Sequence, residues 1–179
     1  RGELREIRAR DLRFTADEAS AYLADVHGLA VGPDDVAALE SRTEGWAAAL
    51  QLAALSMQGR DDVGAFVSGF TGTDRFVVDY LVDEVLSRQS ADVRDFLIRT
   101  SVLDRICGDL CDAVLETSGG AAVLERLDRA NLFVVPLDDE RRWYRYHHLF
   151  ADVLRSHLRA GPAAEVPALH LRASRWYAD

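Results

Sequence analysis

Lysine is missing from this chain of 179 residues, and all 21 of its basic residues are arginine. This excludes two kinds of chemistry, because a P-loop holds nucleotide phosphates with a lysine and a Schiff base forms on a lysine amine. The patterns G-x-S-x-G and H-E-x-x-H are missing too. We therefore expect no independent catalytic site in this chain, which is then no enzyme by itself.

Cysteine is scarce, with only Cys107 and Cys111. We expect reduced, buried and unreactive thiols and no metal, because a structural zinc site needs more ligands in paired elements. The most apolar run, residues 46–57, is too short to span a bilayer. Together with a charged first segment that offers no signal peptide, these absences predict a cytoplasmic protein without membrane contact.

Net positive charge is also lacking, since the chain carries a formal charge of −9. Nucleic acids and acidic membranes are bound mainly through Lys and Arg. The negative net charge therefore disfavours binding of either through the surface of the chain as a whole. What is present is a globular composition, with 49% hydrophobic and 28% charged residues. The length allows one or two small domains.

The first part of the chain is predicted to be helical. Thr15 and Glu18 form a capping-box pattern that predicts a helix over residues 16–27, ended by Gly28. Apolar spacing predicts further helices at residues 33–42, 46–58 and 63–70. A longer helix is predicted after Asp74, and its inward side chains would be Val77, Val78, Leu81, Val82 and Val85. Ahead of this block, residues 4–9 are a weak strand candidate.

The second part begins at a polar stretch, residues 87–90, where Ser90 is suited to cap a helix. Three helices are predicted, around residues 91–97, 110–115 and 120–130. Residues 132–137 and 142–146 then predict a hairpin with a polar turn. Three helices followed by a hairpin is the order of a winged helix. The predicted fold is thus mostly α: a small helical domain followed by a winged-helix domain with one two-stranded β-hairpin.

The last segment follows Gly161 and Pro162, where apolar spacing predicts a final helix over residues 166–176. We expect this helix to lack its packing partner, and we expect the chain to be the middle of a longer protein. The predicted division is 1–14, 15–88, 89–160 and 161–179.

Two histidines stand where the predicted hairpin ends and a helix begins. The next apolar residues, Phe150, Val153 and Leu154, share one helical face. A helix N-terminus presents free N–H groups and partial positive charge, which suits an anion. We expect His148 to pack at the junction, with Asp152 one turn on as its partner, and we expect a functional role for His147.

Two features of this part suggest nucleic acid and are outweighed by charge. Arginines alternate with aromatic residues over 141–146, a pattern that can bind single strands, but the acidic residues 138–140 adjoin it. A winged helix also suggests DNA contact through its third helix. That helix carries two acids and two arginines that cancel, so structural or regulatory use is the favoured interpretation.

A series of motifs in one order carries a family resemblance. They are Asp11-Leu12-Arg13-Phe14-Thr15, Thr43-Glu44-Gly45-Trp46, Gln51-Leu52-Ala53-Ala54-Leu55, Gly59-Arg60, Arg129-Ala130-Asn131-Leu132-Phe133, Pro136-Leu137-Asp138 and Trp143-Tyr144-Arg145-Tyr146-His147-His148-Leu149-Phe150. Together they resemble the large ATP-binding LuxR-type transcriptional regulators of bacteria, the MalT-like group, over nearly the whole chain.

The resemblance implies a place within signal-transduction ATPases of the STAND class. Their order is a P-loop nucleotide domain, a helical domain, a winged helix, helical repeats and a DNA-binding helix-turn-helix. Residues 1–14 would end the nucleotide domain and residues 161–179 would begin the repeats. The implied partners are these neighbouring domains of the same chain, and DNA would be bound only through the helix-turn-helix, which lies outside this segment.

The resemblance also implies nucleotide-binding residues. A G-x-P motif of the class lies against the base, and Gly45, Trp46 and Ala47 match its position, with Ala47 in place of proline. A histidine after the hairpin meets the β-phosphate of ADP, which assigns that role to His147. The class has an aspartate where this chain has His148. The implied cofactor is ADP or ATP in the longer protein, with none expected on the isolated chain.

Three hypotheses follow from the sequence. The first is a nucleotide-sensing regulatory arm that couples the ADP/ATP state and inducer binding to activation of a LuxR-family transcriptional regulator. The second is a stand-alone winged-helix protein that binds nucleic acid. The third is an enzyme with an unrecognised site.

Overall fold

The computed structural model describes residues 9–60, 62–72 and 74–178, and its contacts divide the chain into two units. One unit ends at Val77 and the other begins at Val78, upstream of the boundary that the polar residues 87–90 indicate. The predicted functional boundaries at 14, 88 and 160 stay predictions. The strand candidate at residues 4–9 falls almost wholly outside the described residues, and Ala9 opens a short 3-10 turn, η1 (Ala9–Leu12).

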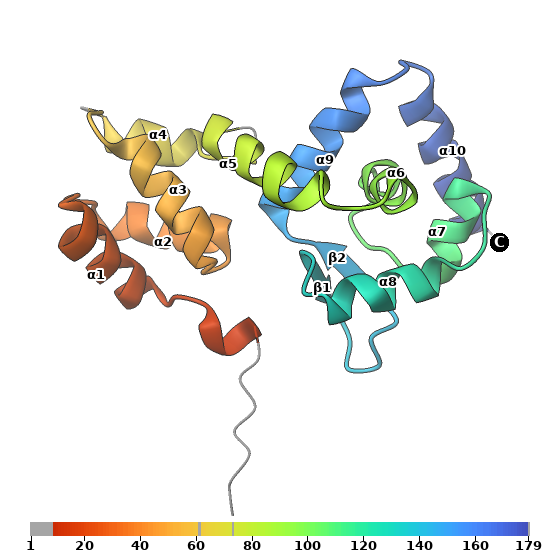
Figure 1. Ribbon diagram of the computed structural model, residues 1–179, viewed down its shortest axis with the longest axis horizontal. Coiled ribbons are helices and arrows are strands. Elements are labelled where there is room, and N and C mark those ends of the chain that lie inside the picture. The colour runs from red at the N-terminus through yellow and green to blue at the C-terminus, as the bar shows by residue number, and fades with distance from the viewer. Residues whose placement is uncertain (1–8, 61, 73, 179) are drawn as a thin grey trace, which may run out of the picture. The chain divides into compact units, whose positions relative to one another are not determined.

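The first unit is helical, as the apolar spacing predicts. Its α-helices are α1 (Ala16–His27), α2 (Pro33–Thr43), α3 (Ala47–Met57), α4 (Val63–Gly69) and the beginning of α5 (Arg75–Tyr80) (Figure 1). The predicted capping box is confirmed, because the Glu18 N–H donates to Thr15 Oγ1 and the Thr15 N–H donates to Glu18 Oε2 at 2.9 Å. Gly28 ends α1 in the left-handed conformation.

The core of the first unit is built around α3. Its buried residues include Leu50, Ala53, Ala54 and Met57, and α1 and α2 both pack against it. Small alanines allow this close approach of helices. Arg42 on α2 reaches the end of α4, where its Nη1 donates to three carbonyl oxygens, those of Val67, Ser68 and Phe70, at 2.6–2.8 Å.

The helix after Asp74 departs from the predicted periodicity. It continues as a π-helix, η2 (Leu81–Leu86), in which the Ser87 N–H donates to the Val82 carbonyl at 2.9 Å. A π-helix has a longer repeat than an α-helix, so the buried face advances from Leu81 to Leu86. Val78, Val82 and Val85, predicted to face inward, are only half-buried. That prediction assumed an unbroken α-helix.

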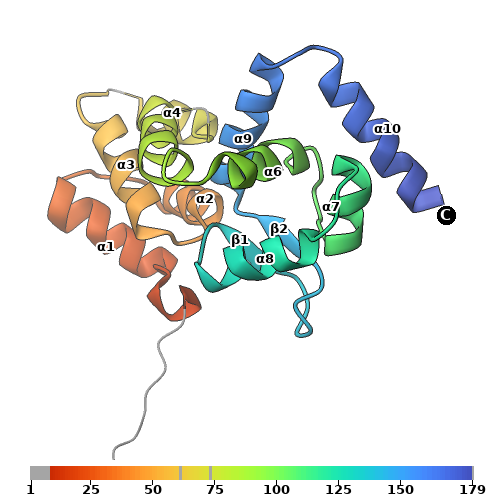
Figure 2. The same cartoon turned by 45° about the vertical axis from the view of Figure 1, so that its right-hand side comes forward.

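The second unit has the predicted order of a winged helix. After η2 it contains α6 (Ala91–Thr100), α7 (Gly108–Leu115), α8 (Gly120–Arg129), β1 (Val134–Pro136), β2 (Tyr144–Tyr146), α9 (His148–Ala160) and α10 (Glu165–Ala178). The two strands are antiparallel, with Val134 opposite Tyr146 and Pro136 opposite Tyr144. The fold class is therefore confirmed: mostly α, with one two-stranded hairpin whose loop extends away from the helices in both views (Figures 1 and 2).

The hairpin is joined to the helices by backbone and side-chain contacts. Ile106, ahead of α7, exchanges two backbone hydrogen bonds of 2.8 Å with Tyr144 on β2. The buried Tyr146 hydroxyl is 2.7 Å from Thr100 Oγ1 at the end of α6. Burial raises the pKa of Tyr146 far above its usual value, so this hydroxyl stays protonated. These contacts fix the strand that leads into α9.

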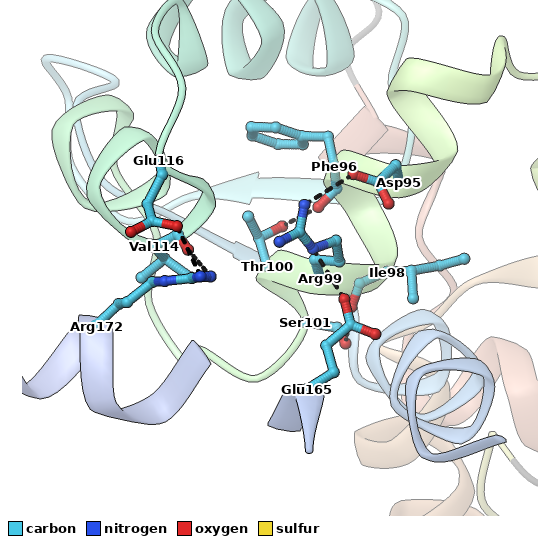
Figure 3. A network of polar contacts seen from close by, with 10 residues as sticks. All are labelled: Asp95, Phe96, Ile98, Arg99, Thr100, Ser101, Val114, Glu116, Glu165 and Arg172. Carbon is cyan, nitrogen blue, oxygen red and sulfur yellow. Dashed lines mark hydrogen bonds and ion pairs between the residues drawn. The ribbon is translucent and has the colours of Figure 1, made fainter. Parts of the chain in front are cut away.

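The final helix is not without a partner, which corrects the expectation from sequence. α10 runs beside α7 and buries Leu169 and Ala173 (Figures 1 and 2). Figure 3 shows two arginines that hold it. Arg99 Nε on α6 lies 3.0 Å from Glu165, and Arg172 reaches Glu116 at 2.7 Å. The sequence does not reveal this partner, because α7, which packs against both α8 and α10, is distant from α10 along the chain.

Candidate functional site

His147 occupies the junction between the hairpin and α9. It follows Tyr146, the last residue of β2, and is the N-cap of α9 with φ −57° and ψ 138°. Its N–H donates to the Phe133 carbonyl at 2.8 Å, and its own carbonyl accepts from the Ala151 N–H at 2.9 Å. The backbone of His147 is therefore fixed from both sides, by the hairpin and by the first turn of the helix.

The side chain of His147 is buried, with 5% of the residue exposed. Its ring meets the Phe133 ring edge-on, at 6.1 Å between centroids and 84° between planes. It also lies 6.1 Å from the tilted ring of His148. In this conformation the imidazole is covered, so a contact with a phosphate requires it to be uncovered.

His148 does not pack into the junction, contrary to the expectation from sequence. It is the first residue of α9 and its side chain is exposed. The reason lies in the strand-to-helix transition, which turns His147 inward and leaves the next residue on the outer side. His148 lines a hollow of about 280 Å³ together with Asp152, and with Arg145 and Arg155.

The start of α9 favours negative charge on a bound group. The first turn of this 13-residue helix contains no acidic residue. The partial positive charge of the helix N-terminus is thus not offset within the first turn, while Asp152, one turn on, and Asp104 line the neighbouring hollow. In the neighbouring hollow Arg155 is engaged by the Ser101 carbonyl at 2.8 Å and by Asp104 at 2.9 Å. The junction thus combines a buried imidazole, a helix N-terminus and cationic side chains.

The second predicted set, Gly45, Trp46 and Ala47, forms the turn between α2 and α3 in the first unit. Gly45 has φ +67°, Trp46 is the N-cap of α3 and Ala47 is its first residue. The Gly45 carbonyl accepts from the Phe14 N–H at 2.8 Å. A Cβ at Gly45 would overlap the Phe14 carbonyl oxygen, so the turn is built directly against the backbone at residue 14. His147 belongs to the other unit.

Of the two cysteines expected to be buried, Cys111 is buried and Cys107 is only half-buried. Cys111 is fully buried in α7, and burial raises the pKa of its thiol well above the usual range. Burial also raises the pKa of Cys107, the half-buried N-cap of α7. Over residues 9–60, 62–72 and 74–178, no three His, Cys, Asp or Glu side chains come close enough together to hold a metal ion.

The arginines near the hairpin loop are paired with carboxylates. Arg141 lies 2.8 Å from Asp128 on α8, and Arg129 pairs with Glu125 on the same helix. The Arg105 guanidinium lies 5.2 Å from the centre of the Trp143 ring. A nucleic acid would have to compete with these carboxylates for Arg141 and Arg129. Among the described residues, no helix is long and apolar enough to cross a membrane.

One residue of the junction was missed from sequence. Phe133 was noticed only as part of a motif, although both its carbonyl and its ring contact His147. Its backbone lies in the left-handed region with φ +57°, which apolar spacing does not reveal because that conformation usually favours glycine or asparagine.

Comparison with known proteins agrees with the winged-helix fold of the second unit. Residues 82–166 match the MalT winged helix domain family. The chain is 41% identical over 177 residues to the serine/threonine-protein kinase PknK of Mycobacterium tuberculosis, covering 99% of this chain and 16% of that protein. It is 35% identical to the HTH-type transcriptional regulators MalT of Klebsiella pneumoniae subsp. pneumoniae and Serratia proteamaculans, covering 100% and 99% of this chain and 20% of each regulator. The chain thus spans a fifth or less of the length of these relatives.

Proposed function

We propose that this MalT-like chain, whose residues 82–166 match the MalT winged helix domain family, is the nucleotide-sensing arm of a larger regulator. In this proposal the helical and winged-helix parts couple the ADP/ATP state and inducer binding to activation. The observation that carries it is the fixed position of His147 at the acid-free N-terminus of α9.

The physical basis is a charge-assisted hydrogen bond. An imidazole N–H that donates to a phosphate oxygen, beside free helix N–H groups, contributes about 1.5–3 kcal/mol. That is enough to shift a two-state equilibrium by roughly tenfold or more. Because His147 is covered in this conformation, the imidazole would contact the phosphate only in a second arrangement of the junction. Two such arrangements are what a nucleotide-dependent switch requires.

The proposal assigns the nucleotide to a composite site. This chain has no lysine for a phosphate-holding loop, so the P-loop would come from an upstream domain. Gly45, Trp46 and Ala47 would approach the base, and His147 the β-phosphate. Helical repeats would follow α10, and DNA would be contacted through a C-terminal helix-turn-helix. The cytoplasm is the proposed location.

The identity of the relatives supports an input role. One relative is named a kinase and others are named transcriptional regulators, yet both kinds share this segment. A segment that is shared by a kinase and by transcriptional regulators fits a sensing role better than the role of the kinase or DNA-binding domain. We therefore propose that the arm itself neither hydrolyses ATP nor binds it tightly when isolated.

Two assays on the isolated chain test this assignment. A gel-shift assay separates it from the alternative of a winged-helix nucleic-acid-binding protein, because we expect no sequence-dependent complex. An ATPase assay separates it from an enzyme. Tight, sequence-dependent binding would favour the alternative, and steady turnover abolished by a point substitution within this chain would overturn the proposal.

A further inference from the structure

Phe133 adopts a backbone conformation that is unfavourable for a bulky side chain. Its φ is +57°, in the left-handed region. The other described non-glycine residues with positive φ occupy places where this is common: Glu44 and Glu116 end helices, Asn131 follows α8, and Arg141 lies in the hairpin loop. Phe133 instead directly precedes strand β1. Such strain persists where the surroundings hold the residue for a purpose.

The conformation lets Phe133 contact His147 in two ways. The hairpin register pairs Val134 with Tyr146, and the next step along it brings the Phe133 carbonyl to the His147 N–H at 2.8 Å. The Phe133 ring meets the His147 ring edge-on and also lies 5.1 Å from the ring of Phe150, in the first turn of α9. One residue thereby holds the backbone of His147 and covers its imidazole.

We propose that Phe133 is the positioning residue of His147. Its carbonyl fixes where the histidine stands, and its ring decides whether the imidazole is covered or open to an anionic ligand. His147 is 5% exposed whereas Phe133 is half-buried, so Phe133 is the more exposed member of the pair. The covering of His147 is independent of the proposed function, and its link to nucleotide reading rests on that function.

The covering is tested by the reaction of histidines with diethyl pyrocarbonate, which modifies exposed imidazoles. In the full-length protein with His148→Gln, which leaves one histidine at the junction, we expect His147 to react slowly. Phe133→Ala should accelerate its modification by roughly three- to tenfold, the effect of removing one aromatic contact. Phe133→Tyr, which keeps the ring, should restore the slow rate.

Two further variants separate positioning from general loss of stability. Leu124→Ala removes a buried side chain from α8 and should leave the His147 rate unchanged. Phe133→Gly suits the left-handed backbone and deletes the same ring, so it replaces Phe133→Ala if that variant does not fold. An unchanged His147 rate in the folded ring-deleting variants, or an equal acceleration in Leu124→Ala, overturns the proposal.

Nucleotide retention tests the link to function separately. We expect Phe133→Ala to raise the ADP that copurifies with the full-length protein, because the imidazole is then open to the phosphate, whereas His147→Ala should lower it. If the His147 rate rises but neither variant changes ADP retention, the covering stands and the nucleotide-sensing function fails. If His147→Ala lowers the ADP content and Phe133→Ala leaves it at or below the wild-type level, the link between Phe133 and nucleotide reading is wrong.

Discussion

Gly45 shows how one residue constrains the turn between α2 and α3. Its φ of +67° disfavours any other residue, and a Cβ there would also come within 3.0 Å of the Arg13 Cβ and overlap the Phe14 carbonyl. We expect Gly45→Ala to lower the free energy of unfolding by about 3 kcal/mol, since it adds steric overlap to backbone strain. Urea denaturation followed by circular dichroism measures the change.

Gly28 is the matched control for this substitution. It has nearly the same φ, +65°, but a Cβ there would meet no atom within 4 Å. Gly28→Ala should therefore lower the free energy of unfolding by only about 1 kcal/mol, the backbone effect alone. Equal losses in the two variants would show that the approach of residue 14 to Gly45 is unimportant.

Glu18 gives the first helix a dependence on pH. Hydrogen bonds from the Thr15 N–H and then from its hydroxyl hold the pKa of the Glu18 carboxyl below its usual value of 4.5. Because the pKa of Glu18 is lower in the folded state than in the unfolded state, the ionised carboxyl stabilises the fold. This stabilisation is complete at a pH above the unfolded-state pKa and is lost as the pH falls through the folded-state pKa. We expect an NMR titration to give a pKa for Glu18 below 4.5, and Thr15→Ala to raise it. A wild-type pKa at or above 4.5 would contradict the capping box.

At the scale of elements, Arg42 joins α2 to the end of α4. The carbonyls of Val67, Ser68 and Phe70 all accept from its Nη1, and Val67 and Phe70 are buried. Arg42→Ala should lower the free energy of unfolding by about 2 kcal/mol, because partly buried carbonyls lose a charge-assisted hydrogen bond, although the Val67 carbonyl keeps the Phe70 N–H as a donor. Arg88→Ala, which breaks only an exposed pair with Glu84, should change it by less than about 0.5 kcal/mol. Similar urea midpoints for the two variants would refute the role of Arg42.

The packing of α10 against the winged-helix unit also belongs to the scale of elements. Figure 3 shows the Arg99–Glu165 ion pair, which contributes to this packing. Arg99 and Glu165 have side chains 25% and 28% exposed, whereas the Arg129–Glu125 pair on α8 is 72% and 58% exposed. A double-mutant cycle should give a coupling energy of about 1 kcal/mol for the first pair and about 0.3 kcal/mol for the second. Indistinguishable couplings would mean that Arg99 does not hold α10.

Elements with local signals were predictable from sequence. The capping box at Thr15, the glycine at position 28 and the polar turn of the hairpin each act within a few residues, so they predict α1 and the two strands correctly. Features set by tertiary packing were not. The π-helix η2 and the docking of α10 on α7 depend on neighbours distant in sequence. His147 is buried and His148 is exposed because the backbone passes from strand β2 to helix α9 between them. Two adjacent histidines in a sequence do not indicate which of them faces inward.

The candidate site was predictable only in part, for the same reason. His147 was identified by its place between a strand and a helix, and by resemblance to a family. Phe133 was not, because a left-handed phenylalanine leaves no pattern in the sequence. Its contact with His147 depends on the hairpin register and exists only after β1 and β2 have paired.

At the scale of the whole molecule, the chain consists of two units, and the residues implied in nucleotide binding are divided between them. Gly45, Trp46 and Ala47 lie in the unit that ends at Val77, and His147 lies in the other. The proposed function gives each set its own role, the base for the first and the β-phosphate for His147. The proposal therefore depends most on whether His147 affects nucleotide retention in the full-length protein.

The most direct measurement is the amount of ADP that copurifies with the full-length protein bearing His147→Ala or His148→Ala. The two residues are adjacent and of one type, but His147 is buried and fixed while His148 is exposed. We expect His147→Ala to retain ADP roughly tenfold more weakly and to raise inducer-independent transcription, because a charge-assisted bond to phosphate is lost. His148→Ala should match the wild type. A folded His147→Ala protein with wild-type ADP content and basal activity would contradict the proposal and leave His147 a packing residue.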